Sequence, residues 1–146
     1  MKKVYLAGPF FDDDQIARIS RAEEALFNNP TISDFFSPRK VNFPEEKEGT
    51  VSWGKKVYQK DIDELEASDV IVAVLDFKDG FVDSGTAFEI GYATNIGKPI
   101  VILHENNGII NLMISNSIVA YFKDANDILQ YDFDKLKTIP YEGPLI

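Results

Sequence analysis

Short apolar runs alternate with longer amphipathic segments along the chain. The short runs are bounded by Gly, Pro, Asn or Asp, which is typical of buried strands. They predict strands at residues 4–8, 34–37, 70–75, 99–104 and 118–122. One longer segment starts at Ser84, the expected N-cap of a helix, and stops at Gly97. The other helices are expected at residues 13–28, 52–67, 112–117 and 126–131.

Two of these helices show an apolar side that should face a core. In the first helix this side consists of Ile16, Ile19, Ala22 and Leu26. In the second it consists of Trp53, Val57, Ile62 and Leu65. The polar, charged stretch between them, residues 39–50, is expected to be an exposed loop.

Strands that alternate with helices indicate an α/β fold with a parallel sheet. The run from Val70 to Leu75 is apolar throughout, as expected of a strand covered on both faces. We expect a single domain, residues 1–146, built on a doubly wound five-stranded parallel sheet (flavodoxin- or Rossmann-like) in the order 2-1-3-4-5. In that order a ligand crevice lies beyond the carboxyl ends of the first and third strands. Residues 8–14 and 76–89 follow those strands.

The segment from Asp83 to Ala93 holds the most informative acid. On a helix, Gly85, Glu89 and Ala93 fall on one face at i, i+4 and i+8. A carboxylate between two small residues leaves room for a ligand to approach it. An acid that is merely favoured near a helix N-terminus by the helix dipole would give the same local pattern, so both interpretations stay open here.

Two further acids belong to the same region. Asp61 lies between Val57 and Leu65 at i−4 and i+4, so it should be desolvated and its pKa raised. A carboxylic acid that is neutral at pH 7 can donate a proton to a leaving group. Asp83 precedes the helix of Glu89, in the loop over the expected crevice. Asp61 could instead pair with Lys60, and Asp83 could simply cap the helix.

The amino-acid composition argues against several classes of catalytic and binding site. The chain has no cysteine and one histidine, His104, which argues against cysteine nucleophiles and multi-histidine metal sites. It has no glycine-rich phosphate-binding motif, and Gly8 precedes a proline that has no amide hydrogen to donate. Carboxylates at a cleft without these other groups fit glycosidic chemistry. Tyr5, Phe10, Phe11 and Tyr92 could supply a flat slot for a base or sugar, although core packing explains most aromatic residues.

The net charge and the apolar runs of the chain limit the classes of binding partner and the cellular locations that we expect. The net charge of −9 argues against nucleic acids and anionic membranes. The apolar run after Lys2 and Lys3 is too short for a signal peptide, and no stretch is long enough to span a membrane. We therefore expect a cytoplasmic protein.

Five segments together carry a resemblance to a known family. They are Tyr5–Phe11, Tyr58–Asp61, Asp83–Tyr92, Asn111–Met113 and Tyr141–Pro144. In this order they resemble the nucleoside 2-deoxyribosyltransferases, over nearly the whole chain. The second matches the family's Tyr-x-x-Asp segment and the third its nucleophile helix. The resemblance implies transfer of 2-deoxyribose between the bases of 2′-deoxynucleosides, without cofactor or metal.

The resemblance also implies catalytic roles. Glu89 would attack C1′ of the nucleoside and form a covalent 2-deoxyribosyl-enzyme, which a second base then attacks. Tyr5 would orient Glu89 through a hydrogen bond. Asp61 would handle the proton at the base, and Asp83 would hold sugar hydroxyls.

Other residues of the matched segments are implied to bind substrate. Gly8, Phe11 and Gly85 would line the site for the deoxynucleoside and the free nucleobase. Asn111 and Met113 would complete the site of a neighbouring subunit, so the resemblance implies a homo-oligomer.

The chain departs from the family at two places. It ends in Ile146 where the family usually has a tyrosine near the active site, and residues 38–50 do not align with the family's base-contacting segment. The preference for purine or pyrimidine bases and the acceptance of ribonucleosides therefore stay open, although the segment Ser84–Gly91 is closer to purine-preferring members.

Two alternative functions stay open. A nucleoside or nucleotide N-glycosidase would use water in place of the second base, although Asp12, Asp13 and Asp14 after the first strand should repel phosphate. A receiver-like signalling domain would use acids after the first strand, Asp76 after the third and Lys123 after the fifth. Its pattern fits less well, because Gly8–Phe11 intervenes before the acids and His104 stands where a Ser or Thr is expected.

Overall fold

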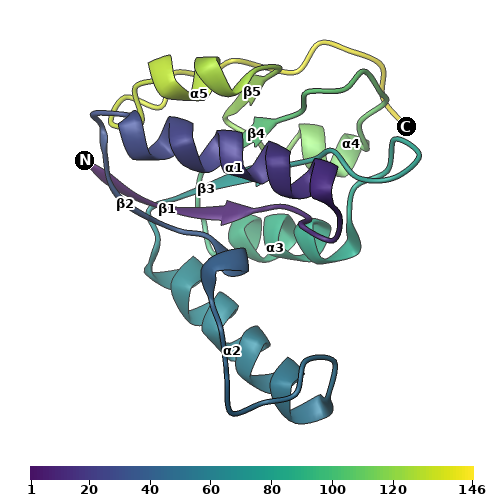
Figure 1. Cartoon of the computed structure of the whole chain (residues 1–146). Coiled ribbons are helices and arrows are strands. Elements are labelled where there is room, and N and C mark those ends of the chain that lie inside the picture. Colours follow the sequence, from purple (N-terminus) through teal and green to yellow (C-terminus); the bar gives the residue numbers. More distant parts are fainter.

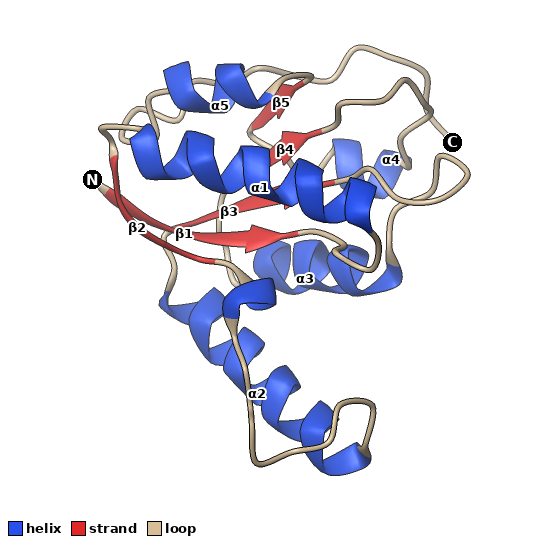
Figure 2. Cartoon of the chain, viewed as in Figure 1, coloured by secondary structure: helices blue, strands red, loops and turns tan.

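The computed structural model describes residues 1–146, with one parallel sheet at its centre (Figures 1 and 2). The sheet has five strands in the order β2-β1-β3-β4-β5, and all neighbouring pairs are parallel. The strands are β1 (Lys2–Ala7), β2 (Ile32–Phe36), β3 (Val70–Val74), β4 (Ile100–Leu103) and β5 (Ala120–Phe122). The expected α/β class and strand order are confirmed, whereas the predicted starts of the second and fifth strands are each off by a few residues.

Helices cover both faces of this sheet (Figure 1). α1 (Asp13–Asn28) and α5 (Ala125–Gln130) pack on one face. On the other face lie α2 (Val51–Ala67), α3 (Ser84–Asn95) and α4 (Leu112–Ser115), and a short 3₁₀ helix, η1 (Pro38–Lys40), follows β2. None of the helices combines the length and the apolar character that crossing a membrane requires.

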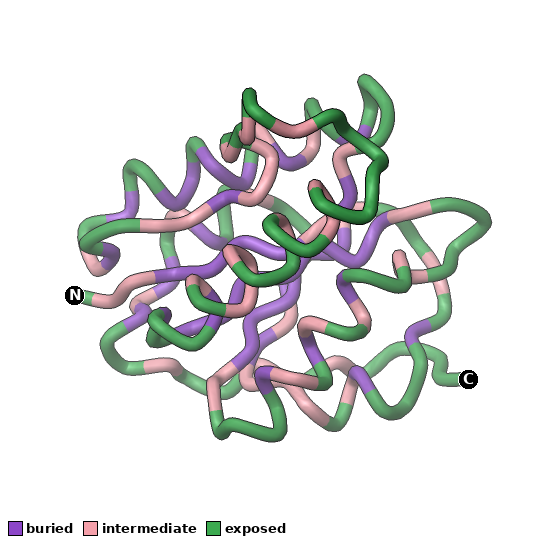
Figure 3. Tube along the Cα trace, turned by 90° about the horizontal axis from the view of Figure 1, so that it is seen from below, coloured by how far each residue is buried: buried purple, intermediate pink, exposed green.

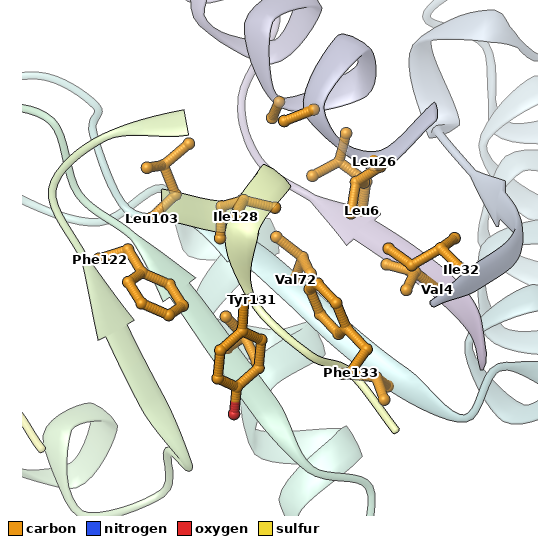
Figure 4. Packing of buried hydrophobic residues seen from close by; sticks show 14 of the residues in the cluster. Val4, Leu6, Leu26, Ile32, Val72, Leu103, Phe122, Ile128, Tyr131 and Phe133 are labelled. Carbon is orange, nitrogen blue, oxygen red and sulfur yellow. The ribbon is translucent and has the colours of Figure 1, made fainter. Parts of the chain in front are cut away.

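The side chains of β1 alternate between two apolar cores. Val4 and Leu6 pack with the side chains of α1 and α5, the core drawn in Figure 4. Tyr5 and Ala7 point to the opposite face, toward α2, α3 and α4. Figure 3 shows the buried residues concentrated along the strands, with the exposed ones on the outer turns. Because both faces are covered, the central strands are apolar throughout.

The predicted cap of α3 is wrong by one residue. Asp83, not Ser84, is the N-cap, and its Oδ2 accepts a hydrogen bond of 3.1 Å from the amide of Thr86. Aspartate and serine are similarly good caps, so composition alone did not separate two adjacent candidates.

Two predicted core sides are only partly confirmed. Ile19, Ala22 and Leu26 of α1 are buried, but Ile16 is 37% exposed. On α2 only Leu65 is buried. The reason is visible in Figure 1, where the first half of α2 extends beyond the sheet and has no core to face.

Gly8 allows α1 to pack closely against β3. A Cβ at this position would lie 2.7 Å from Ile19 Cδ1 and 3.0 Å from Val74 Cβ. We expect Gly8→Ala to lower the free energy of unfolding by roughly 1–3 kcal/mol, because it overpacks a rigid junction. Gly54→Ala is the control, since nothing lies within 4 Å of its added Cβ. Urea denaturation of both variants tests this, and equal stabilities would contradict it.

Candidate active site

Four predicted site residues come together from four parts of the fold. Tyr5 lies on β1, Asp61 on α2, Asp83 at the cap of α3, and Glu89 in the second turn of α3. They are close enough to interact: after burial, the main cause, the carboxylates of Asp61 and Asp83 both raise the pKa of Glu89. β1 and β3 are the strands between which the direction of winding reverses. The acids therefore gather beside the predicted switch point of the sheet.

Glu89 has a buried oxygen without a partner. Its Oε2 forms no hydrogen bond within the protein, which is uncommon for a buried polar atom. Burial raises the pKa of Glu89 to about 7, and the Tyr5 hydroxyl counteracts part of this rise. At neutral pH this side chain is thus divided between its charged and neutral forms, as is typical of catalytic carboxylates.

The hydroxyl of Tyr5 is a second buried group without a hydrogen-bond partner, and it lies near Glu89. The residue is fully buried, yet its hydroxyl has no hydrogen-bond partner within the protein. Burial raises the pKa of Tyr5 far above its ordinary value, and the charges of Glu89 and Asp61 raise it further. The phenol therefore stays protonated and faces the Glu89 carboxylate as a donor. The two groups are not joined by a hydrogen bond of ordinary geometry, as is common in ligand-free active sites.

Asp61 is desolvated, as its apolar neighbours predicted. Burial raises the pKa of Asp61 to about 6, and only the charge of Lys60 opposes this. Lys60 does not form an ion pair with Asp61. Its Nζ instead lies 2.7 Å from Glu64 Oε1. The alternative of a paired surface acid therefore does not describe Asp61.

Asp83 does cap a helix, as its simpler interpretation proposed. Its Oδ2 receives both hydrogen bonds from Thr86, from the backbone amide and from the hydroxyl. Oδ1 takes part in neither, so one oxygen is left for a ligand. A Cβ on Gly85 would lie 3.1 Å from Oδ2, so the glycine avoids crowding at the oxygen that caps the helix.

The loop after β1 carries an aromatic group at the same edge of the sheet. Phe11 is 68% exposed. Its ring stacks on Phe10 at 6.0 Å and meets Phe77, which follows β3, at 6.1 Å. Phe11 is thus available for contact with a ligand. Gly8, in contrast, has an evident packing role between α1 and β3.

Asn111 and Met113 do not join the acids within one chain. Asn111 caps α4 by accepting from the amide of Met113 at 2.9 Å, and both residues are exposed. They line a cavity of about 990 Å³ whose α3 wall is formed by Ala87, Ile90, Gly91 and Thr94. Ala87, Gly91 and Thr94 lie on the side of the helix away from Glu89.

The residues that imitated a receiver domain have structural tasks. Asp12 caps α1 by accepting from the amide of Gln15 at 2.8 Å. Asp76 accepts the amides of Glu105 and Asn106 at 2.9 and 2.7 Å. Lys123 donates to the carbonyl of Asn106. Asp76 and Lys123 thus fasten the loops after β3, β4 and β5 to one another.

Phe36 packs against the candidate site, a contact that the sequence pattern did not predict. Its ring stacks on Tyr5 with centroids 5.5 Å apart and planes at 27°. Lys60 Nζ lies 5.6 Å from the centroid of the Phe36 ring. Phe36 is paired with Tyr5 in the parallel register of β1 and β2. That register was the missing signal, because a local sequence pattern does not show which residues of neighbouring strands pair.

Known proteins resemble this chain both in sequence and in fold. Residues 4–133 match the family model described as nucleoside 2-deoxyribosyltransferase. Nucleoside deoxyribosyltransferases of Limosilactobacillus fermentum and Lactobacillus leichmannii are each 28% identical, over 98% and 97% of this chain and 88% and 96% of theirs. The solved structure of a 2-deoxyribosyltransferase from Bacillus psychrosaccharolyticus is 38% identical and superposes with a TM-score of 0.87, over 95% of this chain and 98% of that one. The chain belongs to the nucleoside 2-deoxyribosyltransferase family.

Proposed function

We propose that this enzyme exchanges the base of a 2′-deoxynucleoside by double displacement at Glu89. A Glu89 oxygen attacks C1′ while the bond from C1′ to the base nitrogen breaks. The departing base takes a proton from Asp61, and a 2-deoxyribosyl ester of Glu89 remains. The nitrogen of a second base then attacks C1′ and returns its proton to Asp61, and the ester bond breaks. Two inversions give net retention at C1′.

The observation that carries this proposal is the buried, unpartnered Oε2 of Glu89 beside Tyr5 and Asp61. A structural acid would have its oxygens satisfied by the protein. Here the carboxylate, a phenol that can only donate to it, and a partly neutral acid share one site. A sugar that lacks the 2-hydroxyl reaches an oxocarbenium-like transition state readily, so this small set of groups suffices.

The supporting roles follow from position. Oδ1 of Asp83 takes no part in the two capping hydrogen bonds from Thr86 and is free to accept a sugar hydroxyl. Phe11 is exposed at the same edge of the sheet and can cover an apolar face of the ligand. Asp12, Asp13 and Asp14 lie next to Phe11 at the start of α1, and their charge favours a free nucleoside over a nucleotide.

Base exchange is tested by incubating deoxyinosine with and without adenine. We expect deoxyadenosine to form rapidly when adenine is present. An N-glycosidase would instead give hypoxanthine and free deoxyribose at a rate that adenine does not change. That result would overturn transfer in favour of hydrolysis.

The two acids also predict a narrow pH dependence. Productive attack needs Glu89 ionised and Asp61 protonated, yet burial raises the pKa of Glu89 to about 7 and that of Asp61 to about 6. At about pH 6.5 roughly a twentieth of the molecules would hold the pair in that form. We expect kcat/KM to peak there and to fall about tenfold per pH unit further out on both sides.

Measuring kcat/KM between about pH 4.5 and 9 tests this expectation. Asp61→Asn is the informative control, because it should remove the fall on the alkaline side and leave the fall on the acidic side. A wild-type profile that is flat across neutral pH would contradict the assignment of both groups.

We also propose that a second copy of the chain completes each site. The support is that Asn111 and Met113 are exposed and border an apolar cavity on the far side of α3 from their own Glu89. Mixing Glu89→Gln with Asn111→Ala chains tests this. If sites are shared between chains, mixed oligomers contain one intact site and activity returns above that of either variant. If each site belongs to one chain, the mixture stays as inactive as its components.

A further inference from the structure

The last residues of the chain form a backbone contact that the proposed reaction does not use. Beyond α5 the chain returns along β5, where Ile139 bridges to Ala120. It then runs beside residues 110–112, with a second bridge between Leu145 and Ile110. The amide of Ile146 donates to the carbonyl of Ile110 at 3.1 Å, and the amide of Leu112 donates to the carbonyl of Ile146 at 2.9 Å. These two bonds bracket Asn111 on both sides.

Tyr141 holds this returning segment in place. Its hydroxyl donates to the carbonyl of Pro144 at 2.8 Å and lies 3.4 Å from that of Gly108. Its ring meets Tyr121 of β5 with centroids 4.8 Å apart, and the Tyr121 hydroxyl lies 3.1 Å from His104 Nδ1. The segment is thus anchored to β4 and β5 at one end and to the Asn111 loop at the other.

Asp76 and Lys123 hold the start of this loop at Glu105 and Asn106, whereas the returning segment supplies the backbone hydrogen bonds on either side of Asn111. α4 is a single short turn, and Asn111 and Met113 are exposed. Its start is capped only by the side chain of Asn111 itself. A loop that must present a side chain to another subunit gains precision from a rigid support, because small displacements of a positioning group weaken catalysis strongly.

We propose that residues 141–146 act as a positioning strap that holds Asn111 and Met113 in the conformation in which they enter the neighbouring site. The strap works through the amide and carbonyl of Ile146, a residue that also lines the cavity beside Asn111 and Met113. The consequence for activity rests on the proposed function, whereas the effect on the Asn111 loop does not.

A pair of substitutions at one position tests the strap. Ile146→Pro removes the amide that donates to Ile110, whereas Ile146→Ala keeps it. Hydrogen exchange of the full-length variants should show the amides of Ile110 and Leu112, which donate to Pro144 and Ile146, exchanging at least about tenfold faster in Ile146→Pro than in Ile146→Ala. Exchange in β1 and α3 should be equal in both, which controls for the fold. Equal exchange at residues 110–112 would overturn the strap.

The base-exchange activity of the same variants then shows whether the strap acts on the site of its own chain or on that of a neighbour. We expect kcat/KM of Ile146→Pro to be at least about tenfold lower than that of Ile146→Ala, because both variants lose the isoleucine side chain and only the first loses the amide. Mixing Ile146→Pro with Glu89→Gln chains should restore the exchange of nucleobases. The intact strap of the Glu89→Gln chain then supports the site that contains Glu89 of the other chain. No restoration would contradict action on the neighbour. If the wild-type chain itself exchanged no bases, the proposed function would fail, and the hydrogen-exchange comparison would still decide the strap.

Discussion

Replacement of Glu89 by alanine or glutamine is expected to abolish base exchange, with a loss of at least about a thousandfold in kcat. The reaction as proposed needs an oxygen that forms a bond to C1′, and neither substitute provides one of comparable nucleophilicity. Asp61 is held on α2 and Asp83 is committed to capping the start of α3, so neither replaces it. The measurement is the initial rate of deoxyadenosine formation. Activity of either variant within about tenfold of wild type would remove Glu89 from the nucleophile role.

Stability provides the control for this substitution. Because burial raises the pKa of Glu89 from 4.5 to about 7, the folded state binds its proton more tightly than the unfolded state. The stability linked to that proton is complete below about pH 4.5 and is lost as the pH rises through about 7. The shift corresponds to a change of order 3 kcal/mol. Glu89→Gln should therefore gain stability relative to wild type over this window, and a constant difference would contradict a buried, titrating carboxyl group.

Replacement of Asp61 by asparagine is expected to give the second largest loss, about 10²- to 10⁴-fold in the rate of base departure. Asparagine is nearly isosteric and keeps hydrogen bonding, but it cannot deliver a proton. Nucleoside binding should change much less than cleavage. Single-turnover cleavage of deoxyinosine with excess enzyme measures the step directly.

The leaving group supplies a further contrast for Asp61. A base that already carries a positive charge leaves the deoxynucleoside without protonation. Asp61→Asn should therefore cleave such a substrate at nearly the wild-type rate. An equal loss with neutral and charged bases would assign Asp61 to binding or folding. Unchanged single-turnover cleavage of deoxyinosine would refute its role at the base altogether.

Much of the fold followed from local patterns. The continuous apolar run of β3 and the spacing of Ile19, Ala22 and Leu26 indicated buried strands and a packed helix, and the structure agrees. Errors arose where two residues satisfy the same local rule, as Asp83 and Ser84 do at the cap of α3. The exposed outer half of α2 could not be foreseen, because periodicity shows which side of a helix is apolar but not where the sheet ends.

Some features of the candidate site could be predicted from the sequence, and others could not. The pKa of Asp61 rises because of burial, as its apolar neighbours on α2 suggested. The stacking of Phe36 on Tyr5 depends on the register between β1 and β2, which no local pattern encodes. Nor does any pattern within one chain show whether Asn111 belongs to its own site or to a neighbour's, because that depends on a surface made by distant segments.

The most direct test of the central claim is mass spectrometry of the protein after exposure to a 2′-deoxynucleoside, or a 2-fluorinated analogue, without an acceptor base. The account predicts a mass increase of one sugar group, located on the peptide that contains Glu89 and removed when adenine is added. A chain that exchanges bases under these conditions while the Glu89 peptide stays unmodified, or carries the sugar on another residue, would contradict it.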